Sequence, residues 1–254
     1  MACDLKGRGI LVTRAAHQAS GLMQLIESHQ GRAVALPAIE IAPCQDPEAA
    51  LALLQQSWDL VIFISPNAVR FAAELLSEQQ LQSQQVAAVG NATARALQAV
   101  GWPPNLIPQG RYDSEGLLML PALQQMHERR VLIVRGVGGR PLLGDSLQAR
   151  GAEVGYAEVY RRLRPEVDPA PLLDRWRSQV DMVTATSAEV LDNLVAILGN
   201  PGWPLLRETP LLVISERMVA RAHELGFTQV LRASAADDQA LLSALCDWTA
   251  NSGR

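Results

Sequence analysis

The apolar positions of this chain occur in short runs that alternate with amphipathic segments. Residues 59–65 and 131–134 contain runs without the polar alternation of a half-exposed strand. Such runs are typical of strands that are buried on both faces, as in parallel sheets. Between the runs, Leu22, Leu25 and Ile26 have the spacing of one buried helical face. Strands that alternate with helices predict an α/β fold, with helices on both faces of a parallel sheet.

The same pattern gives approximate positions for the elements. Strands are expected at residues 10–12, 33–36, 39–43, 59–65, 86–89, 131–134, 154–160, 181–187 and 211–214. Helices are expected around residues 22–26, 51–54, 69–75, 97, 116–120 and 219–225. Gly31 is expected to end the first helix and Ser114 to cap the helix at 116–120. The Pro/Gly-rich patches at 101–108 and 199–204 are predicted to be loops.

The second half of the chain resembles the first. The matched pairs are 10–14 with 131–135, 30–34 with 150–154, 59–65 with 181–187, and 86–89 with 211–214. Their offsets all lie between 120 and 125 residues, in the same order along the chain. One match between short apolar strands carries little weight, but four in register indicate an internal duplication. Two copies predict two sheets, and a chain of 254 residues fits two modest domains.

Composition indicates an ordinary soluble protein. The longest uncharged apolar stretch, residues 60–69, is shorter than the roughly 18 residues that a membrane helix needs. The N-terminal residues lack the apolar core of a secretory signal. A net charge of −4 gives no global attraction for nucleic acid. The chain is therefore expected to have neither a membrane nor a nucleic acid as its partner.

The cysteines predict the redox environment. Cys3, Cys44 and Cys246 are few, odd in number and widely spaced. This pattern predicts thiols in a reducing cytoplasm rather than a disulfide framework.

The strand-to-helix turns are the candidate site, because parallel α/β sheets bind ligands beyond the carboxyl ends of their strands. Free N–H groups at helix N-termini bind anions, and arginine adds bidentate contacts to carboxylate or phosphate. The turns therefore predict a ligand with several negative groups, held in a cleft between two domains. The alternative is that the polar residues only cap helices. The turn residues are Thr13, Arg14, Ser65, Asn67, Gly90, Thr93, Asp113, Ser114, Arg135, Gly136, Gly138, Gly139, Arg140, Ser187 and Ser215.

Familiar catalytic and nucleotide motifs do not occur in the sequence. Gly136-Val137-Gly138 is not a dinucleotide fingerprint, because Pro141 stands where the third glycine should be. The four histidines are scattered, which argues against a metal site. The scarcity of acid–base groups fits an enzyme whose substrate is reactive and mainly needs to be held in shape.

Tyr160 is a separate candidate. It ends the expected strand at 154–160 and precedes three arginines within residues 161–164. A core or interface tyrosine is the default interpretation. The alternative is a hydroxyl that faces the cleft, because the chain here leaves one unit for another.

These residues resemble those of the bacterial uroporphyrinogen-III synthases. The resemblance covers residues 10 to about 226, so it spans nearly the whole chain. Family members diverge strongly, so the ordered combination is specific while no single motif is. The stretches are ILVTR at 10–14, DLVIFISPNAV at 59–69, VAAVGNATARAL at 86–97, SEGLL at 114–118, VLIVRGVGGRPLL at 131–143, RGAEVGYAEVYRR at 150–162 and the serine-ended strand at 181–187.

The resemblance implies two doubly wound parallel-sheet domains of flavodoxin-like or Rossmann-like type, with the active site in the cleft between them. One domain is then expected at residues 1–38 plus 164–254, and the other at 42–161. The linkers are expected near 39–41 and 161–164. The duplication is therefore split across the domains.

The resemblance also implies the reaction and its partners. The family removes water from hydroxymethylbilane, inverts ring D and closes the macrocycle to uroporphyrinogen III, without a metal or organic cofactor. The eight carboxylates of this substrate agree with the anion-binding turns. We expect a cytoplasmic monomer, with a dimer left open, and a transient contact with hydroxymethylbilane synthase.

The resemblance assigns roles to individual residues. Tyr160 matches the family's cleft tyrosine, and we expect it to donate a hydrogen bond that assists departure of the hydroxyl. Ser65, Thr93, Ser187 and Ser215 match hydroxyl positions that contact substrate carboxylates. Two departures weaken this assignment: Ile64 stands where the family commonly has a hydroxyl residue, and Glu216 brings an acid beside Ser215.

Two other functions remain as alternatives. A non-catalytic two-domain module that binds a small anionic ligand would have a similar fold, since fold does not fix function. A nucleotide-sugar transferase is the weaker alternative, because neither an acid–base pair nor a nucleotide loop is visible.

Overall fold

A computed structural model describes residues 3–77 and 81–251 of the chain. They form two compact units. Unit 1 comprises Met1–Glu40 and Leu163–Arg254, and unit 2 comprises Ile41–Arg162. Each unit contains one five-stranded sheet with helices packed against it, so the chain has the expected α/β fold class.

Unit 1 has the strand order β10-β9-β8-β1-β2, and neighbouring strands are parallel. Its strands are β1 (Gly9–Val12), β2 (Arg32–Ala35), β8 (Met182–Thr184), β9 (Leu211–Val213) and β10 (Val230–Arg232). Its helices are α1 (Ala16–Ser28), α7 (Ala170–Leu173), α8 (Trp176–Gln179), α9 (Ala188–Glu208), α10 (Glu216–Leu225) and α11 (Asp238–Asn251).

Unit 2 has the strand order β3-β7-β6-β4-β5, with parallel pairing along β7-β6-β4-β5. Its strands are β3 (Glu40–Pro43), β4 (Trp58–Phe63), β5 (Ser83–Ala88), β6 (Arg130–Gly136) and β7 (Glu153–Leu163). Its helices are α2 (Pro47–Leu54), α3 (Pro66–Leu76), α4 (Asn91–Ala99), α5 (Ser114–Leu118), the short 3-10 helix η1 (Pro121–Leu123) and α6 (Leu142–Ala149).

The two sheets share one strand order. The order β9-β8-β1-β2 in unit 1 corresponds to β5-β4-β6-β7 in unit 2, with the strands matched as the sequence repeat pairs them. Unit 1 adds β10 beside β9. At the corresponding edge of unit 2, Leu106 forms an isolated parallel bridge to Ala87 of β5. This shared order agrees with the expected duplication.

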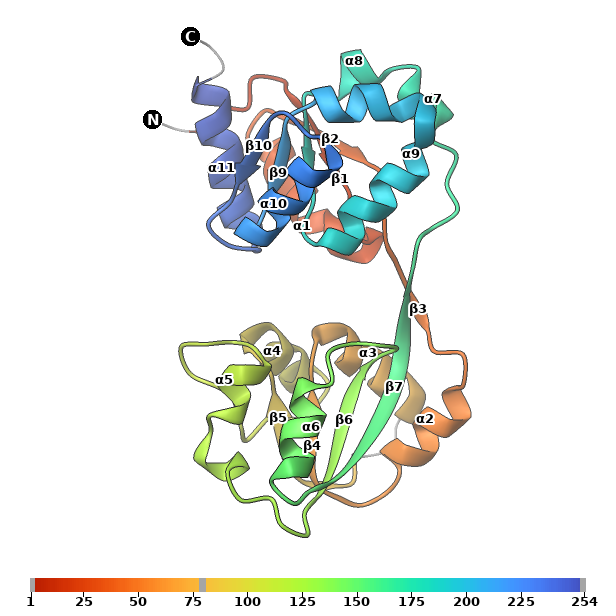
Figure 1. Ribbon diagram of the computed structural model, residues 1–254, viewed down its shortest axis with the longest axis vertical. Coiled ribbons are helices and arrows are strands. Elements are labelled where there is room, and N and C mark those ends of the chain that lie inside the picture. The colour runs from red at the N-terminus through yellow and green to blue at the C-terminus, as the bar shows by residue number, and fades with distance from the viewer. Residues whose placement is uncertain (1–2, 78–80, 252–254) are drawn as a thin grey trace. The chain divides into compact units, whose positions relative to one another are not determined.

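The sheet of unit 2 is buried on both faces. Val61 and Phe63 of β4 belong to a core cluster with residues of α2, α3 and α4, whereas Leu60 and Ile62 belong to a second cluster with α5 and α6. In Figure 1, α6 accordingly lies on the opposite face of this sheet from α3. Successive apolar side chains therefore enter two separate cores, which explains why the strand is apolar throughout.

The sheet of unit 1 is covered in the same way on one face by α1 and α11. Ile10 and Val12 of β1 pack in a cluster with Leu22 and Ile26 of α1 and with Leu241 of α11. The residue between them, Leu11, is also fully buried, on a strand whose side chains alternate between the two faces. Parallel pairing on both sides of β1 leaves its carboxyl end, at Thr13, at the edge where α1 begins.

Two local predictions are wrong. Residues 199–204 are helical and not a loop: α9 continues through Pro201 and Pro204 after a break at Gly199, whose φ is 57°. Gly199 ends one helical segment, and Pro201 falls in the first turn of the next, where the backbone N–H has no intrahelical partner to lose, whereas Pro204 lies inside that segment. At α5, Asp113 is the cap in place of Ser114, and its carboxylate accepts from the Gly116 N–H at 2.8 Å.

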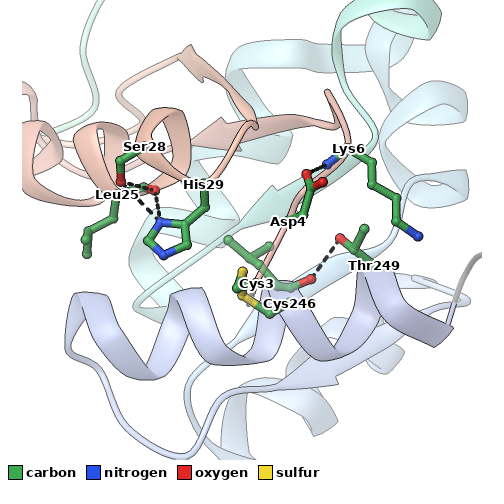
Figure 2. Close-up of a disulfide and its surroundings, with 9 residues drawn as sticks. Cys3, Asp4, Lys6, Leu25, Ser28, His29, Cys246 and Thr249 are labelled. Carbon is green, nitrogen blue, oxygen red and sulfur yellow. Dashed lines mark hydrogen bonds between the residues drawn. A yellow bond between two sulfur atoms is a disulfide. The ribbon is translucent and has the colours of Figure 1, made fainter. Parts of the chain in front are cut away.

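The expectation of free thiols is also wrong for two of the three cysteines. Cys3 and Cys246 form a disulfide, with 5.4 Å between their Cα atoms and 243 residues between them in sequence. Figure 2 shows this bond joining the segment before β1 to α11. The wide spacing along the chain was misleading, because α11 packs against the N-terminal segment through Leu5 and Leu245. Cys44 is a free thiol.

Candidate functional site

Tyr160 lies at the carboxyl edge of the unit 2 sheet and is 3% exposed. The sequence predicted Tyr160 to be the last residue of its strand, but β7 continues to Leu163. The pairing of β6 with β7 shifts register between Arg135 and Gly136: Glu158 faces Arg135, but Tyr160 faces Gly136. Val159 is therefore an extra residue on β7. Such a bulge re-aims the side chain that follows it.

The bulge turns Tyr160 toward α3. Side chains on β7 alternate, so Tyr160 would otherwise share a face with Tyr156, which packs with the α5 and α6 cluster. Instead Tyr160 belongs to the cluster that contains α3, and its ring stacks on Phe71 with 5.8 Å between centroids. Its backbone carbonyl accepts from the Val137 N–H at 2.7 Å.

The Tyr160 hydroxyl lies beside Ser65. The Ser65 Oγ is 3.2 Å from the Tyr160 Oη, and it also accepts from the Ala68 N–H at 3.1 Å as the cap of α3. Pro66 follows as the first helical residue, where its fixed φ suits a helix start. The local sequence Ser-Pro-Asn thus starts α3 and places a hydroxyl against Tyr160. Asn67, in the first turn of α3, is partly buried.

Arg135 ends the apolar run of β6 and is engaged locally. Its guanidinium donates from Nε and Nη2 to the Glu158 Oε1, at 3.2 and 2.9 Å, and lies 4.2 Å from the centroid of the Tyr156 ring. The Arg135 side chain is 16% exposed. Nothing in the sequence pairs these residues, but neighbouring positions on parallel strands β6 and β7 bring them together.

The glycine turn after β6 has the backbone that only glycine adopts readily. Gly138 and Gly139 have φ values of 72° and 122°, and a Cβ built on either would meet no atom within 4 Å. Gly136 is different, because a Cβ there would lie 2.6 Å from the Tyr160 ring. Two glycines thus leave open space beside the turn, and the third makes room for the tyrosine.

A cavity of about 270 Å³ lies at this carboxyl edge, between the glycine turn and the segment that leads into α5. Five of the predicted turn residues line it: Asp113, Ser114, Arg135, Gly139 and Arg140. Tyr112 and Tyr156 also line it, and their position on either side of β6 could not be read from the sequence. A larger cavity of about 590 Å³ lies near Ser83, at the amino-terminal end of β5, where parallel sheets do not bind ligands.

Charged residues of both signs surround this cavity. Arg111 donates to Asp113 at 2.6 Å, and Arg140 lies 3.5 Å from Glu115. The pKa of the Asp113 carboxyl is lowered, first by the hydrogen bond from the Gly116 N–H and then by Arg111. Asp113 also raises the pKa of the Arg111 guanidinium through their hydrogen bond. Asp113 and Glu115 therefore balance the charge of the two arginines at this turn.

The start of α4 is one of three predicted turns, with the starts of α1 and α6, whose helix has no side-chain cap hydrogen bond among the described residues. Gly90 is its N-cap, and within the described residues no side-chain hydrogen bond caps this helix. Thr93 is buried in its first turn. The N–H groups of this turn thus keep the donor capacity that the serines of other turns take up.

The predicted residues of unit 1 hold their own sheet edge together. The Thr13 hydroxyl is buried and donates to the Thr184 carbonyl at 2.5 Å. Arg14 is ion-paired with Asp238 and donates to the Ala236 carbonyl at 2.7 Å. These contacts show a structural role for both residues.

Ser187 and Ser215 are helix caps. The Ser187 Oγ accepts from the Val190 N–H at 3.1 Å, and the Ser215 Oγ accepts from the Met218 N–H at 3.3 Å. Glu216, the acid beside Ser215, is paired with Arg232 at 2.8 Å. The capping interpretation thus holds for Ser65, Ser187 and Ser215. Each hydroxyl also keeps one proton that it can donate.

Neither a metal cluster nor a membrane span is found in residues 3–77 and 81–251. No group of three or more His, Cys, Asp and Glu residues in these ranges could hold a metal ion. None of the helices described there is long and apolar enough to cross a membrane.

Comparison with known proteins identifies the family. The family model described as uroporphyrinogen-III synthase HemD matches residues 20–243. The chain is 41% identical over 246 residues to uroporphyrinogen-III synthase from Escherichia coli (strain K12), which covers 93% of this chain and 99% of that one. The chain belongs to the uroporphyrinogen-III synthase family.

Solved uroporphyrinogen III synthases have the same fold. A mutant of the enzyme from the extremely thermophilic bacterium Thermus thermophilus aligns with a TM-score of 0.60 and 21% identity, over 96% of this chain and 99% of that one. The uroporphyrinogen-III synthetase from Helicobacter pylori 26695 aligns with a TM-score of 0.61 and 16% identity, over 97% and 100%. At these identities the likeness concerns the fold.

Proposed function

We propose that this chain converts hydroxymethylbilane into uroporphyrinogen III, as a hydro-lyase of tetrapyrrole biosynthesis. The observation that carries the proposal is the match to the family over residues 20–243. The carboxyl edge of the unit 2 sheet offers a place for the chemistry, since it combines a held tyrosine hydroxyl, open glycine backbone and uncapped helix amides.

The reaction balances with water as the only other product. The C–O bond of the terminal hydroxymethyl group breaks, and the hydroxyl leaves as water with one proton taken up. An electron-poor azafulvene remains. A new carbon–carbon bond to the substituted carbon of ring D gives a spiro intermediate, which fragments and recloses with ring D inverted. Ring D then loses one proton and regains its aromaticity.

The protein's task is to make the spiro route faster than direct closure. Free hydroxymethylbilane closes to the uninverted type I isomer, so the fold of the bound substrate decides the product. A difference of roughly 3 kcal/mol between the two transition states gives a preference of more than about a hundredfold. Positioning can supply a difference of this size.

We assign Tyr160 the role of assisting departure of the hydroxyl by donating a hydrogen bond to it. The position of Tyr160 supports this role. The bulge at Val159 directs the ring toward α3, and the Tyr160 Oη lies at the N-terminus of α3 beside Ser65. A hydrogen bond that strengthens as charge develops lowers the barrier.

We assign the remaining turn residues to the substrate carboxylates. The hydroxyls of Ser187 and Ser215 each have a proton to donate, and the amides that follow Gly90 in α4 are suited to a carboxylate. The pair with Glu158 uses two of the three guanidinium nitrogens of Arg135. The other assigned residues are Asn67, Thr93, Ser114, Gly136, Gly138 and Gly139, whereas Thr13 and Arg14 hold the edge of the unit 1 sheet together.

We further propose a cytoplasmic monomer that receives its substrate in a transient contact with hydroxymethylbilane synthase. The proposed location rests on the family and not on the cysteines, because Cys3 and Cys246 form a disulfide. Such a contact would limit the time in which free substrate closes spontaneously to the type I isomer. Binding of the two purified proteins, measured with and without substrate, tests this contact.

Chromatographic isomer analysis tests the proposed activity. Purified protein with hydroxymethylbilane should give the type III isomer in large excess over type I. Product that is only type I, formed at the uncatalysed rate, would contradict the proposal. Tight binding of a small anion without tetrapyrrole activity would then favour the non-catalytic binding module.

A further inference from the structure

We propose that Ser65 is a positioning residue for Tyr160: its hydroxyl donates to the Tyr160 Oη and leaves the phenolic proton for the departing hydroxyl of the substrate. This inference rests on the proposed function of Tyr160. It assigns Ser65 a role that differs from helix capping and from direct contact with a substrate carboxylate.

The Tyr160 ring has little freedom to move. Gly136 approaches one part of it so closely that a Cβ there would lie 2.6 Å from two ring atoms, and Phe71 stacks on it with an interplanar angle of 20°. The backbone is fixed by the hydrogen bond from the Val137 N–H. With the ring held, the direction of the O–H bond is the remaining freedom, and Ser65 is the neighbour that can fix it.

The donors and acceptors permit the direction that this role requires. The Ser65 Oγ already accepts from the Ala68 N–H, and a serine hydroxyl has one proton to donate. Donation of that proton to the Tyr160 Oη lets the Ser65 hydroxyl donate one hydrogen bond while it accepts another. The phenolic O–H then points to a different acceptor. In the opposite arrangement the tyrosine proton would be held by Ser65 and withheld from the substrate.

The position of the pair at the start of α3 favours the same direction. α3 has 11 residues and Ser65 is its N-cap, so the helix presents partial positive charge there. As the substrate hydroxyl leaves, the Tyr160 oxygen shares its proton and becomes more negative. The Ser65 O–H and the α3 dipole both stabilise that charge, so their effect is larger in the transition state than in the ground state.

A set of substitutions separates this role from capping. Ser65→Gly removes the hydroxyl while glycine remains an acceptable N-cap, and Ser65→Thr keeps both the hydroxyl and the cap. Asp46→Ala is the matched control, because Asp46 caps α2 in the same unit through the Ala49 N–H at 2.9 Å. Each variant is made alone, and Ser65→Gly is also combined with Tyr160→Phe. The kcat, the KM and the product isomers are measured for all of them.

We expect Ser65→Gly to lower kcat roughly tenfold with KM changed less than about twofold. Ser65→Thr should keep the kcat of the wild type. Asp46→Ala should keep kcat. In the Tyr160→Phe background, Ser65→Gly should have almost no further effect, because the group through which it acts is gone. A full effect in that background, or an effect on KM alone, overturns the inference in favour of direct substrate contact. Wild-type protein without type III product would instead refute the proposed function itself.

Discussion

Gly136 and Tyr160 face each other across the shifted register of β6 and β7, and a Cβ at position 136 would lie 2.6 Å from the tyrosine ring. The absence of a side chain at Gly136 thereby determines where the Tyr160 ring can lie. Because the same ring contacts Phe71 on α3, any displacement by a side chain at 136 also moves the hydroxyl relative to Ser65.

Gly136→Ala should therefore lower both stability and activity. The added methyl group requires the Tyr160 ring to shift, and such overpacking costs about 1–3 kcal/mol in the free energy of unfolding. We expect kcat to fall at least about tenfold. Steady-state kinetics and chemical denaturation measure the two effects.

Gly155→Ala is the matched control for this prediction. Gly155 lies on β7, the strand that carries Tyr160, and a Cβ there would lie 2.7 Å from the Trp58 ring. This variant should lose a similar amount of stability and keep its kcat. An equal loss of kcat in both variants would show that general destabilisation, and not the position of Tyr160, causes the effect.

Tyr160→Phe should separate the hydroxyl from the ring. The variant keeps the stacking on Phe71 and the fit against Gly136, so its thermal midpoint should stay close to that of the wild type. We expect kcat to fall about tenfold or more, because a hydrogen bond to the leaving hydroxyl is lost. Kinetics identical to the wild type would reduce Tyr160 to a packing residue.

The sequence was sufficient for the fold class because the apolar pattern records burial directly. Leu60 and Ile62 face one core while Val61 and Phe63 face the other, so a strand between two helical layers must be apolar throughout. The repeat of this pattern also indicated two sheets, and the structure shows that they share one strand order. The capping alternative for Ser65, Ser187 and Ser215 followed from local sequence, because the cap lies within three residues of the amide it accepts from, although at α5 the cap is Asp113 and not Ser114.

Contacts between distant segments could not be predicted from the sequence. Nothing near Tyr160 indicates the bulge at Val159, which depends on the pairing of β7 with β6. The ion pair of Arg135 with Glu158 and the cavity positions of Tyr112 and Tyr156 come from the same pairing and from the segment before α5. The helical course of residues 199–204 was missed because proline usually breaks a helix, whereas Pro201 suits the first turn of the segment after Gly199 and Pro204 lies inside that segment.

The Gly116 amide at the start of α5 should lose its protection from hydrogen exchange in acid. The pKa of Asp113 is lower in the folded chain than its unfolded value of about 3.9, so its stabilising effect is complete above that value. The effect is lost as the pH falls through the lower, folded pKa. Asp113→Asn keeps a good N-cap but does not titrate, so its Gly116 amide should lack this acid-dependent loss of protection.

Amide hydrogen exchange of Gly116, expressed as a protection factor, measures this difference between wild type and Asp113→Asn. Asp113→Ala serves as the control without a cap, with a cost of about 1 kcal/mol at neutral pH. Equal acid dependence in wild type and Asp113→Asn would show that another group controls the start of α5.

Cys44 should react slowly with thiol reagents near neutral pH. Burial raises the pKa of its thiol above the ordinary value, so the reactive thiolate is a smaller fraction of the molecules. The rate of alkylation of the native protein should be lower than that of a free model thiol and should rise steeply with pH. A rate equal to the model thiol at pH 7 would contradict the burial of this side chain.

The bond between Cys3 and Cys246 should stabilise unit 1 by restricting the unfolded chain. It closes a loop of nearly the whole sequence, and bonds that close long loops contribute about 2–4 kcal/mol to the free energy of unfolding. Denatured, unreduced protein should show one reactive thiol, that of Cys44, and three after reduction, since the sequence contains three cysteines. Cys246→Ser should lower the thermal midpoint of the oxidised protein to that of the reduced wild type. Three reactive thiols before reduction would show that the bond does not form, and the midpoint of Cys246→Ser should then equal that of the untreated wild type.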